Sequence, residues 1–205
     1  NVTRPTHRNT SWDWARFETC AQKWVDLSEG DYGVSLLNDC KYGHDIHDNV
    51  IRITLLRSPT MPDPMADFGE HEFKYSLYPH VGSWNEETQR EAYLLNDPII
   101  SYRSRVEGRK SGKPISNLQS LLSCASPNII IETVKQAENG DGIIVRLYES
   151  QRKRGQVRVR FRSDVESAWV TNLLEENESA LSVDQASIIL NLKPYQIMTL
   201  RVKLK

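Results

Sequence analysis

The most suggestive polar cluster in the sequence is the group Asn38, Asp39 and Lys41, which directly follows the short apolar run 34–37. A strand end that presents several polar groups on a rigid scaffold is a common position for binding residues. A carboxylate accepts hydrogen bonds and an amide both accepts and donates them. A capped turn with an Asp39–Lys41 pair explains the same pattern, so this run alone leaves a structural and a functional interpretation open.

Two histidines three residues apart, His44 and His47, lie beside Asp45 and Asp48. Imidazole and carboxylate groups are metal ligands, so these residue types could bind a metal ion. The segment lies between two strand patterns, however, and on a strand or turn an offset of three does not bring side chains together. We therefore predict a polar hairpin tip and no metal site.

Tryptophans are concentrated near the start of the sequence, at Trp12, Trp14 and Trp24. Exposed aromatic rings stack on sugars, so a platform built on Trp12, Trp14 or Trp84 would make the chain a free-standing carbohydrate-binding module. Buried aromatic rings contribute large apolar areas to a core. We expect most of these rings to be buried.

A basic stripe accompanies the strictly alternating run 157–161, with Arg158, Arg160 and Arg162 on one face and apolar residues on the other. Such a face could attract phosphates. We predict a solvated strand face instead, because edge charges discourage aggregation between sheets. The sequence contains no glycine-rich phosphate loop, no G-x-S-x-G motif and no H-E-x-x-H motif, so conventional catalytic signatures are missing.

The composition is that of a soluble globular protein. Of 205 residues, 39% are apolar and 26% are charged, with a net charge of −1. No apolar run is long enough to span a bilayer, and the near-neutral charge predicts neither a nucleic acid nor a membrane as a partner. The three cysteines, Cys20, Cys40 and Cys124, are too few for a disulfide scaffold, and we expect them to be free and buried in a reducing compartment.

Hydrophobic periodicity predicts an all-β fold. In the second half, strands are expected over 129–134, 143–148, 157–161, 188–192 and 198–204; in the last of these, Thr199, Arg201 and Lys203 are expected on the outer face. In the first half, strands are expected over 34–37, 49–56 and 70–77, with a proline-rich loop over 58–68 and a short helix within 83–92 capped by Ser83 or Asn85. Residues 101–120 are expected to form a loop, and we place a domain boundary near residue 125.

Several long motifs run in register from about residue 4 to the C-terminus. They are RPTHRNTSWDWARFE at 4–18, KWVDLSE at 23–29 and LLNDCKYG at 36–43, followed by shorter runs at 55–59, 69–75, 134–138 and 145–149. Together they make the chain resemble the α-mannosidases of glycoside hydrolase family 38, of the cytosolic and bacterial type. By this resemblance, residues 1–125 are expected to be the later strands of a large mutarotase-like β-sandwich, and residues 126–205 a small antiparallel β-sandwich.

The resemblance implies that this chain is the C-terminal β region of a retaining, zinc-dependent enzyme that hydrolyses terminal α-mannosides in oligosaccharides in the cytoplasm. The nucleophile and the zinc ligands of the family lie upstream. We therefore expect no catalytic residue, metal ligand or cofactor in this segment, and no activity from it alone. Its expected partners are the upstream catalytic domain of the same chain and an α-mannoside oligosaccharide. Asn38, Asp39 and Lys41 are expected to line the sugar pocket, and open sheet edges would favour a homo-oligomer.

Overall fold

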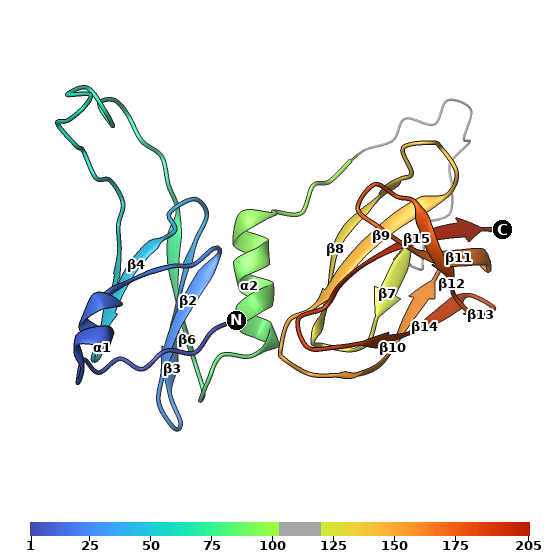
Figure 1. The fold of residues 1–205 in the computed structure, drawn as a ribbon, viewed down its shortest axis with the longest axis horizontal. Coiled ribbons are helices and arrows are strands. Elements are labelled where there is room, and N and C mark those ends of the chain that lie inside the picture. Colours follow the sequence, from blue (N-terminus) through green and yellow to red (C-terminus); the bar gives the residue numbers. More distant parts are fainter. Residues whose placement is uncertain (103–119) are drawn as a thin grey trace, which may run out of the picture. The chain divides into compact units, whose positions relative to one another are not determined.

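The computed structural model describes residues 1–102 and 120–205 (Figure 1). The chain divides into two compact units, Val2–Ser104 and Arg105–Lys205, and Asn1 belongs to the second unit. Both units are built from antiparallel sheets, which confirms the predicted all-β fold. Neither helix found within the described ranges is long and apolar enough to cross a membrane. The loop expected over 101–120 falls almost entirely outside the described residues.

The first unit contains two three-stranded antiparallel sheets and two helices. It begins with helix α1 (Ser11–Ala15). One sheet has the strand order β1 (Glu18–Cys20), β4 (Gly43–His47) and β5 (Val50–Ile53). The other has the order β2 (Trp24–Ser28), β3 (Gly33–Asn38) and β6 (Tyr75–His80). Helix α2 (Glu86–Asn96) packs on β3.

Strand β3 is the central element of the second of these sheets, and its side chains are almost all buried. Leu36 faces Val25 on one neighbouring strand and Leu77 on the other, so one face of the sheet is apolar. Asn85, one of the two caps predicted, immediately precedes α2, and its side chain accepts hydrogen bonds from the backbone N–H groups of the first turn. Strands β5 and β6 are shorter than the sequence pattern predicts, and 70–74 is not part of a strand.

The second unit is a sandwich of a four-stranded and a five-stranded antiparallel sheet (Figure 1). The four-stranded sheet has the order β13 (Val183–Asp184), β14 (Ser187–Leu192), β10 (Gly155–Phe161) and β7 (Leu122–Cys124). The five-stranded sheet has the order β12 (Asn177–Ala180), β11 (Val165–Thr171), β15 (Ile197–Leu204), β9 (Ile143–Glu149) and β8 (Ile129–Gln136). Strand β7 pairs with β10, although it precedes the boundary predicted near residue 125.

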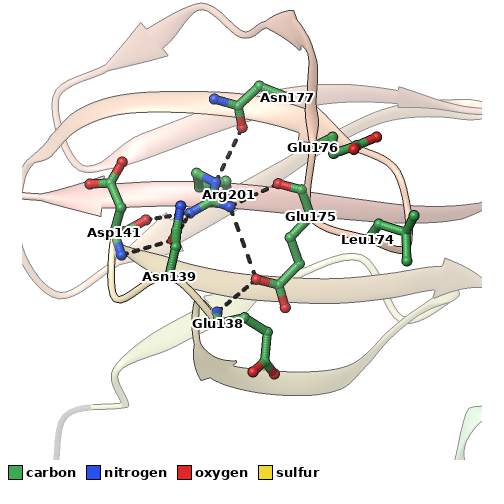
Figure 2. Close-up of a pocket in the computed structure, with 8 residues that line it drawn as sticks. All are labelled: Glu138, Asn139, Asp141, Leu174, Glu175, Glu176, Asn177 and Arg201. Atoms are coloured by element: carbon green, nitrogen blue, oxygen red, sulfur yellow. Dashed lines mark hydrogen bonds and ion pairs between the residues drawn. The ribbon is translucent and has the colours of Figure 1, made fainter.

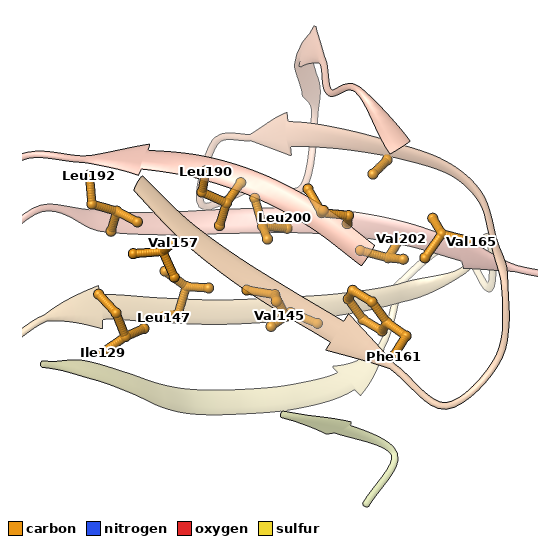
Figure 3. Close-up of a cluster of buried hydrophobic side chains, with 13 residues drawn as sticks. Ile129, Val145, Leu147, Val157, Phe161, Val165, Leu190, Leu192, Leu200 and Val202 are labelled. Atoms are coloured by element: carbon orange, nitrogen blue, oxygen red, sulfur yellow. The ribbon is translucent and has the colours of Figure 1, made fainter. Parts of the chain in front are cut away.

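The core of the sandwich is formed by alternating side chains that both sheets direct inward (Figure 3). On β10, Val157, Val159 and Phe161 are buried, while Arg158 and Arg160 are exposed. This alternation confirms the predicted solvated basic face, because the side chains of a strand alternate between the two sides of the sheet.

Two expectations about burial were wrong. Trp12 and Trp14 are 75% and 58% exposed rather than buried in a core. They lie on α1, a five-residue helix none of whose residues is buried. Cys20 and Cys40 are free, as expected, but both are exposed. These positions therefore contribute little to the core of the first unit as the structure describes it.

Glu149 ends strand β9 as a buried carboxylate, with 1% of the residue exposed. Burial raises its pKa, but hydrogen bonds from the backbone N–H groups of Tyr195, Lys153 and Gln151 and from the Asn128 amide outweigh burial, so the pKa lies below its ordinary value. The ionised form is therefore favoured by the fold.

Acidification is expected to weaken the protein partly through Glu149. A carboxylate with a lowered pKa contributes stability that is present above its unfolded pKa, about 4.3, and is lost as the pH falls further. We expect Glu149→Gln to reduce the loss of unfolding free energy between pH 6 and pH 3, measured by urea unfolding at each pH. Glu178→Gln, at an exposed position on β12, should retain the full wild-type loss. Parallel curves for Glu149→Gln and the wild type would contradict this prediction.

Candidate functional site

The three predicted site residues lie together where strand β3 ends. Asn38 is fully buried, and its side-chain oxygen accepts a hydrogen bond of 3.0 Å from the backbone N–H of Lys41. Its backbone carbonyl accepts a hydrogen bond of 2.9 Å from the side-chain amide of Asn96, on α2. Asn38 therefore shapes the turn that presents Asp39 and Lys41, and it connects this turn to α2.

Asp39 is held in its ionised form by donors from its surroundings. Its carboxylate accepts a hydrogen bond of 2.9 Å from the backbone N–H of Lys74 and a further one from the Cys40 thiol. These bonds, led by that from Lys74, lower the pKa of Asp39, and the bond to the carboxylate raises the pKa of the Cys40 thiol. A carboxylate has about four lone-pair positions, so Asp39 can still accept hydrogen bonds from a ligand.

Lys41 lies on the same turn, but its ammonium group does not pair with Asp39. Its Nζ lies 5.2 Å from the centre of the Phe73 ring, a cation–π arrangement. The backbone of Lys41, rather than its charge, closes the turn on Asn38. The three predicted residues therefore do lie on one turn. Two of the contacts that hold them come from the segment 73–74, which no sequence pattern connects with this turn: Lys74 contacts Asp39, and Phe73 contacts Lys41.

The histidine pair does not form a metal site. His44 and His47 lie three residues apart on β4, an odd offset that directs them to opposite faces. His44 is 1% exposed, burial lowers its pKa, and its Nδ1 lies 3.1 Å from the Tyr42 carbonyl. Across 1–102 and 120–205, no group of three or more His, Cys, Asp or Glu side chains could hold a metal ion. These described residues therefore do not fit the zinc that family resemblance implies.

A serine, a histidine and an aspartate also meet inside the first unit, but they do not form a catalytic triad. His80 Nε2 lies 2.6 Å from the Asp26 carboxylate and 3.2 Å from the Ser35 hydroxyl, while that hydroxyl donates to Asp26 at 2.7 Å. In a triad the acid and the serine contact different ring nitrogens, whereas both face Nε2 in this cluster. Ser35 is fully buried, so the cluster joins β2, β3 and β6 instead.

The second unit contains a cavity of about 340 Å³ that sequence reasoning missed (Figure 2). Arg201, from the central strand β15, forms its floor, and the turns after β8 and β11 form its walls. The alternating pattern places Arg201 on the outer face, as expected, but the side chain is 5% exposed because these turns cover it. The outer face of β15 was expected to be exposed, and this was wrong for Arg201 and also for Thr199, which is 4% exposed.

The guanidinium of Arg201 is fully engaged by these turns (Figure 2). It donates to the side-chain oxygens of Asn139 and Asn177, at 2.8 and 3.2 Å, and to the carbonyls of Asp141 and Glu175, at 2.7 and 2.8 Å. The Glu175 carboxylate lies 4.0 Å away and also pairs with Lys135 at 2.8 Å. The donors of Arg201 are thus all directed to groups of the protein itself. We therefore interpret Arg201 as a structural residue that joins the two turns.

Two family models match this chain, over residues 1–65 and 128–200. Residues 1–65 match the model of the glycosyl hydrolases family 38 C-terminal domain. Residues 128–200 match that of the glycosyl hydrolases family 38 C-terminal beta sandwich domain. The second match coincides with the small sandwich described above.

Individual relatives agree with these matches. Alpha-mannosidase 2C1 of Mus musculus is 38% identical over 211 residues, which cover 100% of this chain and 20% of that protein. Alpha-mannosidase G of Dictyostelium discoideum is 38% identical over 207 residues, which cover 98% of this chain and 19% of that protein.

The solved structure of an alpha-mannosidase from Enterococcus faecalis V583 superposes with a TM-score of 0.72 at 26% identity, over 98% of this chain and 23% of that one. This chain thus spans about a fifth of the length of the curated relatives it matches. These matches do not fit the alternative of a free-standing carbohydrate-binding module. The chain belongs to glycoside hydrolase family 38, as part of its C-terminal β region.

Proposed function

We propose that this chain acts as the C-terminal β region of a retaining α-mannosidase, and that Asn38, Asp39 and Lys41 line the sugar pocket of that enzyme. The observation that carries the proposal is the match of both units, over nearly the full chain, to enzymes named alpha-mannosidases. The reaction would be hydrolysis of terminal α-mannosides in oligosaccharides, and the upstream catalytic domain of the same chain would be the partner of this region. By family resemblance, the enzyme would work in the cytoplasm.

The chemistry of the β3 turn supports its assignment to a sugar pocket. Asp39 is ionised and is held by the Lys74 backbone and the Cys40 thiol, so it can accept hydrogen bonds from sugar hydroxyls without rearrangement. Lys41 supplies a donor on the same turn, and Asn38 holds the turn in place. Carboxylate, ammonium and amide groups in a fixed arrangement are suited to a polyhydroxylated ligand.

Under the proposal, this region supplies neither the zinc ligands nor the nucleophile of the enzyme. The described residues offer no group of metal ligands, so the zinc expected for the full enzyme by resemblance would be bound in the upstream catalytic domain. The contribution of this region would be to bind and orient the substrate. Self-association through open sheet edges and uncovered apolar surface of the large sandwich stays a prediction, which light scattering at high concentration would test.

The proposal predicts that hydrolysis requires chain upstream of Asn1. We expect 4-nitrophenyl α-mannoside, with added zinc, to be hydrolysed by an extended protein that includes the catalytic domain and not by the 205-residue chain. Comparing release of 4-nitrophenol by the two proteins at equal molar concentration measures this directly. Hydrolysis by the 205-residue chain would overturn the proposal, and Asp39, His44 and His47 would then be the first residues to replace.

The assignment of Asp39 predicts a separate effect on catalysis. In the extended enzyme, Asp39→Asn should lower kcat/KM for the aryl α-mannoside by roughly 10- to 100-fold, the loss expected when a hydrogen bond to a charged group is removed. The amide retains an oxygen that can accept the Lys74 hydrogen bond, so the melting temperature should change little. Asp31→Asn, on the exposed turn between β2 and β3, is the matched control. An unchanged kcat/KM for Asp39→Asn would refute the assignment of Asp39 while leaving the proposed enzyme class intact.

A further inference from the structure

The first unit carries a strong negative charge, but its basic residues are not evenly distributed. Residues 2–104 contain ten basic and 16 acidic residues, a net charge of −6. Three of the ten, Arg4, Arg8 and Arg16, lie within the first 17 residues and line one small cavity together with His7. Positive charge is therefore concentrated at one place on an otherwise acidic unit.

The cavity is formed where the segment 4–8 runs beside strand β4. The backbone N–H of Asp48 donates a hydrogen bond of 3.4 Å to the Thr6 carbonyl, and Ile46 of β4 contributes to the lining. The enclosed volume is about 30 Å³, about the space that one water molecule occupies in the liquid. A space of this size admits an oxygen atom of an anion whose remaining atoms stay outside, and it is too small for a sugar ring.

Arg8 is held firmly at this cavity. Its guanidinium donates a hydrogen bond of 3.0 Å to Asp45, which also pairs with Arg52 at 2.8 Å, so one carboxylate is shared by two guanidinium groups. The Arg8 guanidinium also lies 5.3 Å from the centre of the Trp14 ring, and its side chain is 15% exposed. Arg8 is thus a donor whose direction is set before any ligand binds.

The positive charges of the cavity outnumber its one lining carboxylate, Asp13, which lies 3.9 Å from His7. Asp13 accepts hydrogen bonds from the backbone N–H groups of Asn9 and Thr10 and from the Thr10 hydroxyl, at 3.0 to 3.2 Å, and so completes the cap of α1. Arg4 and Arg16 form no ion pair with any residue in the described part of the chain. Three guanidinium groups and one carboxylate, Asp13, line this space, so it keeps an excess of positive charge that attracts an anion.

We propose that this cavity, lined by Arg4, His7, Arg8 and Arg16, binds the oxyanion group of a small molecule, either a phosphate ester or a carboxylate. Planar guanidinium groups match the oxygen geometry of both anions. Trp14, which is 58% exposed and lies beside Arg8, offers a flat surface to the rest of the ligand. The site lies apart from the β3 turn in sequence and does not depend on the proposed function.

Calorimetric titration of the 205-residue chain with inorganic phosphate, sodium acetate and a hexose phosphate tests this proposal, with chloride keeping the ionic strength constant. We expect saturable binding and a change in tryptophan fluorescence from Trp14. Tighter binding of hexose phosphate than of acetate identifies a phosphate ester as the ligand class, and the reverse order identifies a carboxylate. Both results support an oxyanion site. Absence of saturable binding for all three would overturn the proposal.

Matched double variants separate a specific site from general charge effects. Arg4→Gln/Arg16→Gln should weaken binding by about tenfold or more, because two charged hydrogen-bond donors are removed. Arg57→Gln/Arg90→Gln removes the same charge from the same unit outside the cavity, and should change the affinity by less than about twofold. Equal weakening in the two double variants would mean that the anions respond only to net charge, and the site would be rejected.

Discussion

Replacing Gly33 with alanine is expected to lower the free energy of unfolding by about 3 kcal/mol, the upper end of the usual cost of overpacking. A Cβ atom at this position would overlap His80 Cε1 and would lie 2.6 Å from the Gly82 carbonyl oxygen and 2.8 Å from Ser28 Cβ. His80 cannot move aside cheaply, because its Nε2 lies 2.6 Å from the Asp26 carboxylate and its side chain is 5% exposed. The alanine would therefore force β3 away from β6 or break the buried Asp26–His80 pair.

Urea unfolding followed by tryptophan fluorescence reports this effect, since four of the five tryptophans belong to the first unit. Gly30→Ala is the matched control. It lies in the turn of the same hairpin, an added Cβ there meets no atom within 4 Å, and its φ is not in the left-handed region. We expect the control to change stability by less than about 0.5 kcal/mol. Equal stability of the two variants would show that β3 and β6 can separate without cost.

The strands of the second unit could be predicted because one physical signal dominates there. In 157–161, every second side chain enters the core and the arginines between them stay in water, so periodicity alone identifies the strand and its buried face. The same reasoning failed for Arg201. Its position on the outer face of β15 was correct, but the turns that cover that face, around Asn139 and Glu175, come from distant parts of the sequence. Hydrophobic periodicity predicts on which face of a sheet a side chain lies, but it does not predict which other segments of the chain cover that face.

The first unit was harder to predict because short elements and remote contacts determine it. Thr10 and Asp13 form a capping box, a spacing readable in the sequence, and the resulting helix α1 leaves Trp12 and Trp14 exposed rather than in a core. At the β3 turn, the grouping of Asn38, Asp39 and Lys41 followed from the sequence. The donors that fix it did not: Lys74 lies 35 residues from Asp39, and no local pattern connects the two.

Replacing Arg201 with methionine is expected to destabilise the second unit by about 3 to 5 kcal/mol, the usual cost of removing one partner from a buried ion pair. Methionine fills much of the same space but leaves the carbonyls of Asp141 and Glu175 without their donor. It also leaves the Glu175 carboxylate with Lys135 as its remaining cationic partner. The turns after β8 and β11 would lose the group that joins them, as the contacts in Figure 2 make clear.

Differential scanning calorimetry should show this loss as a lowered transition for Arg201→Met, and amide hydrogen exchange should be fastest in the two turns that Arg201 joins. Arg158→Met provides the control: its guanidinium pairs with Asp184 at 2.8 Å, but the two side chains are 48% and 63% exposed. An exposed pair of this kind contributes less than about 1 kcal/mol. If both variants lost the same small amount, the buried donors of Arg201 would be replaceable by water. The cavity beside Arg201 would then be a solvated pocket open to ligands, and Arg201 would not be the residue that joins the two turns.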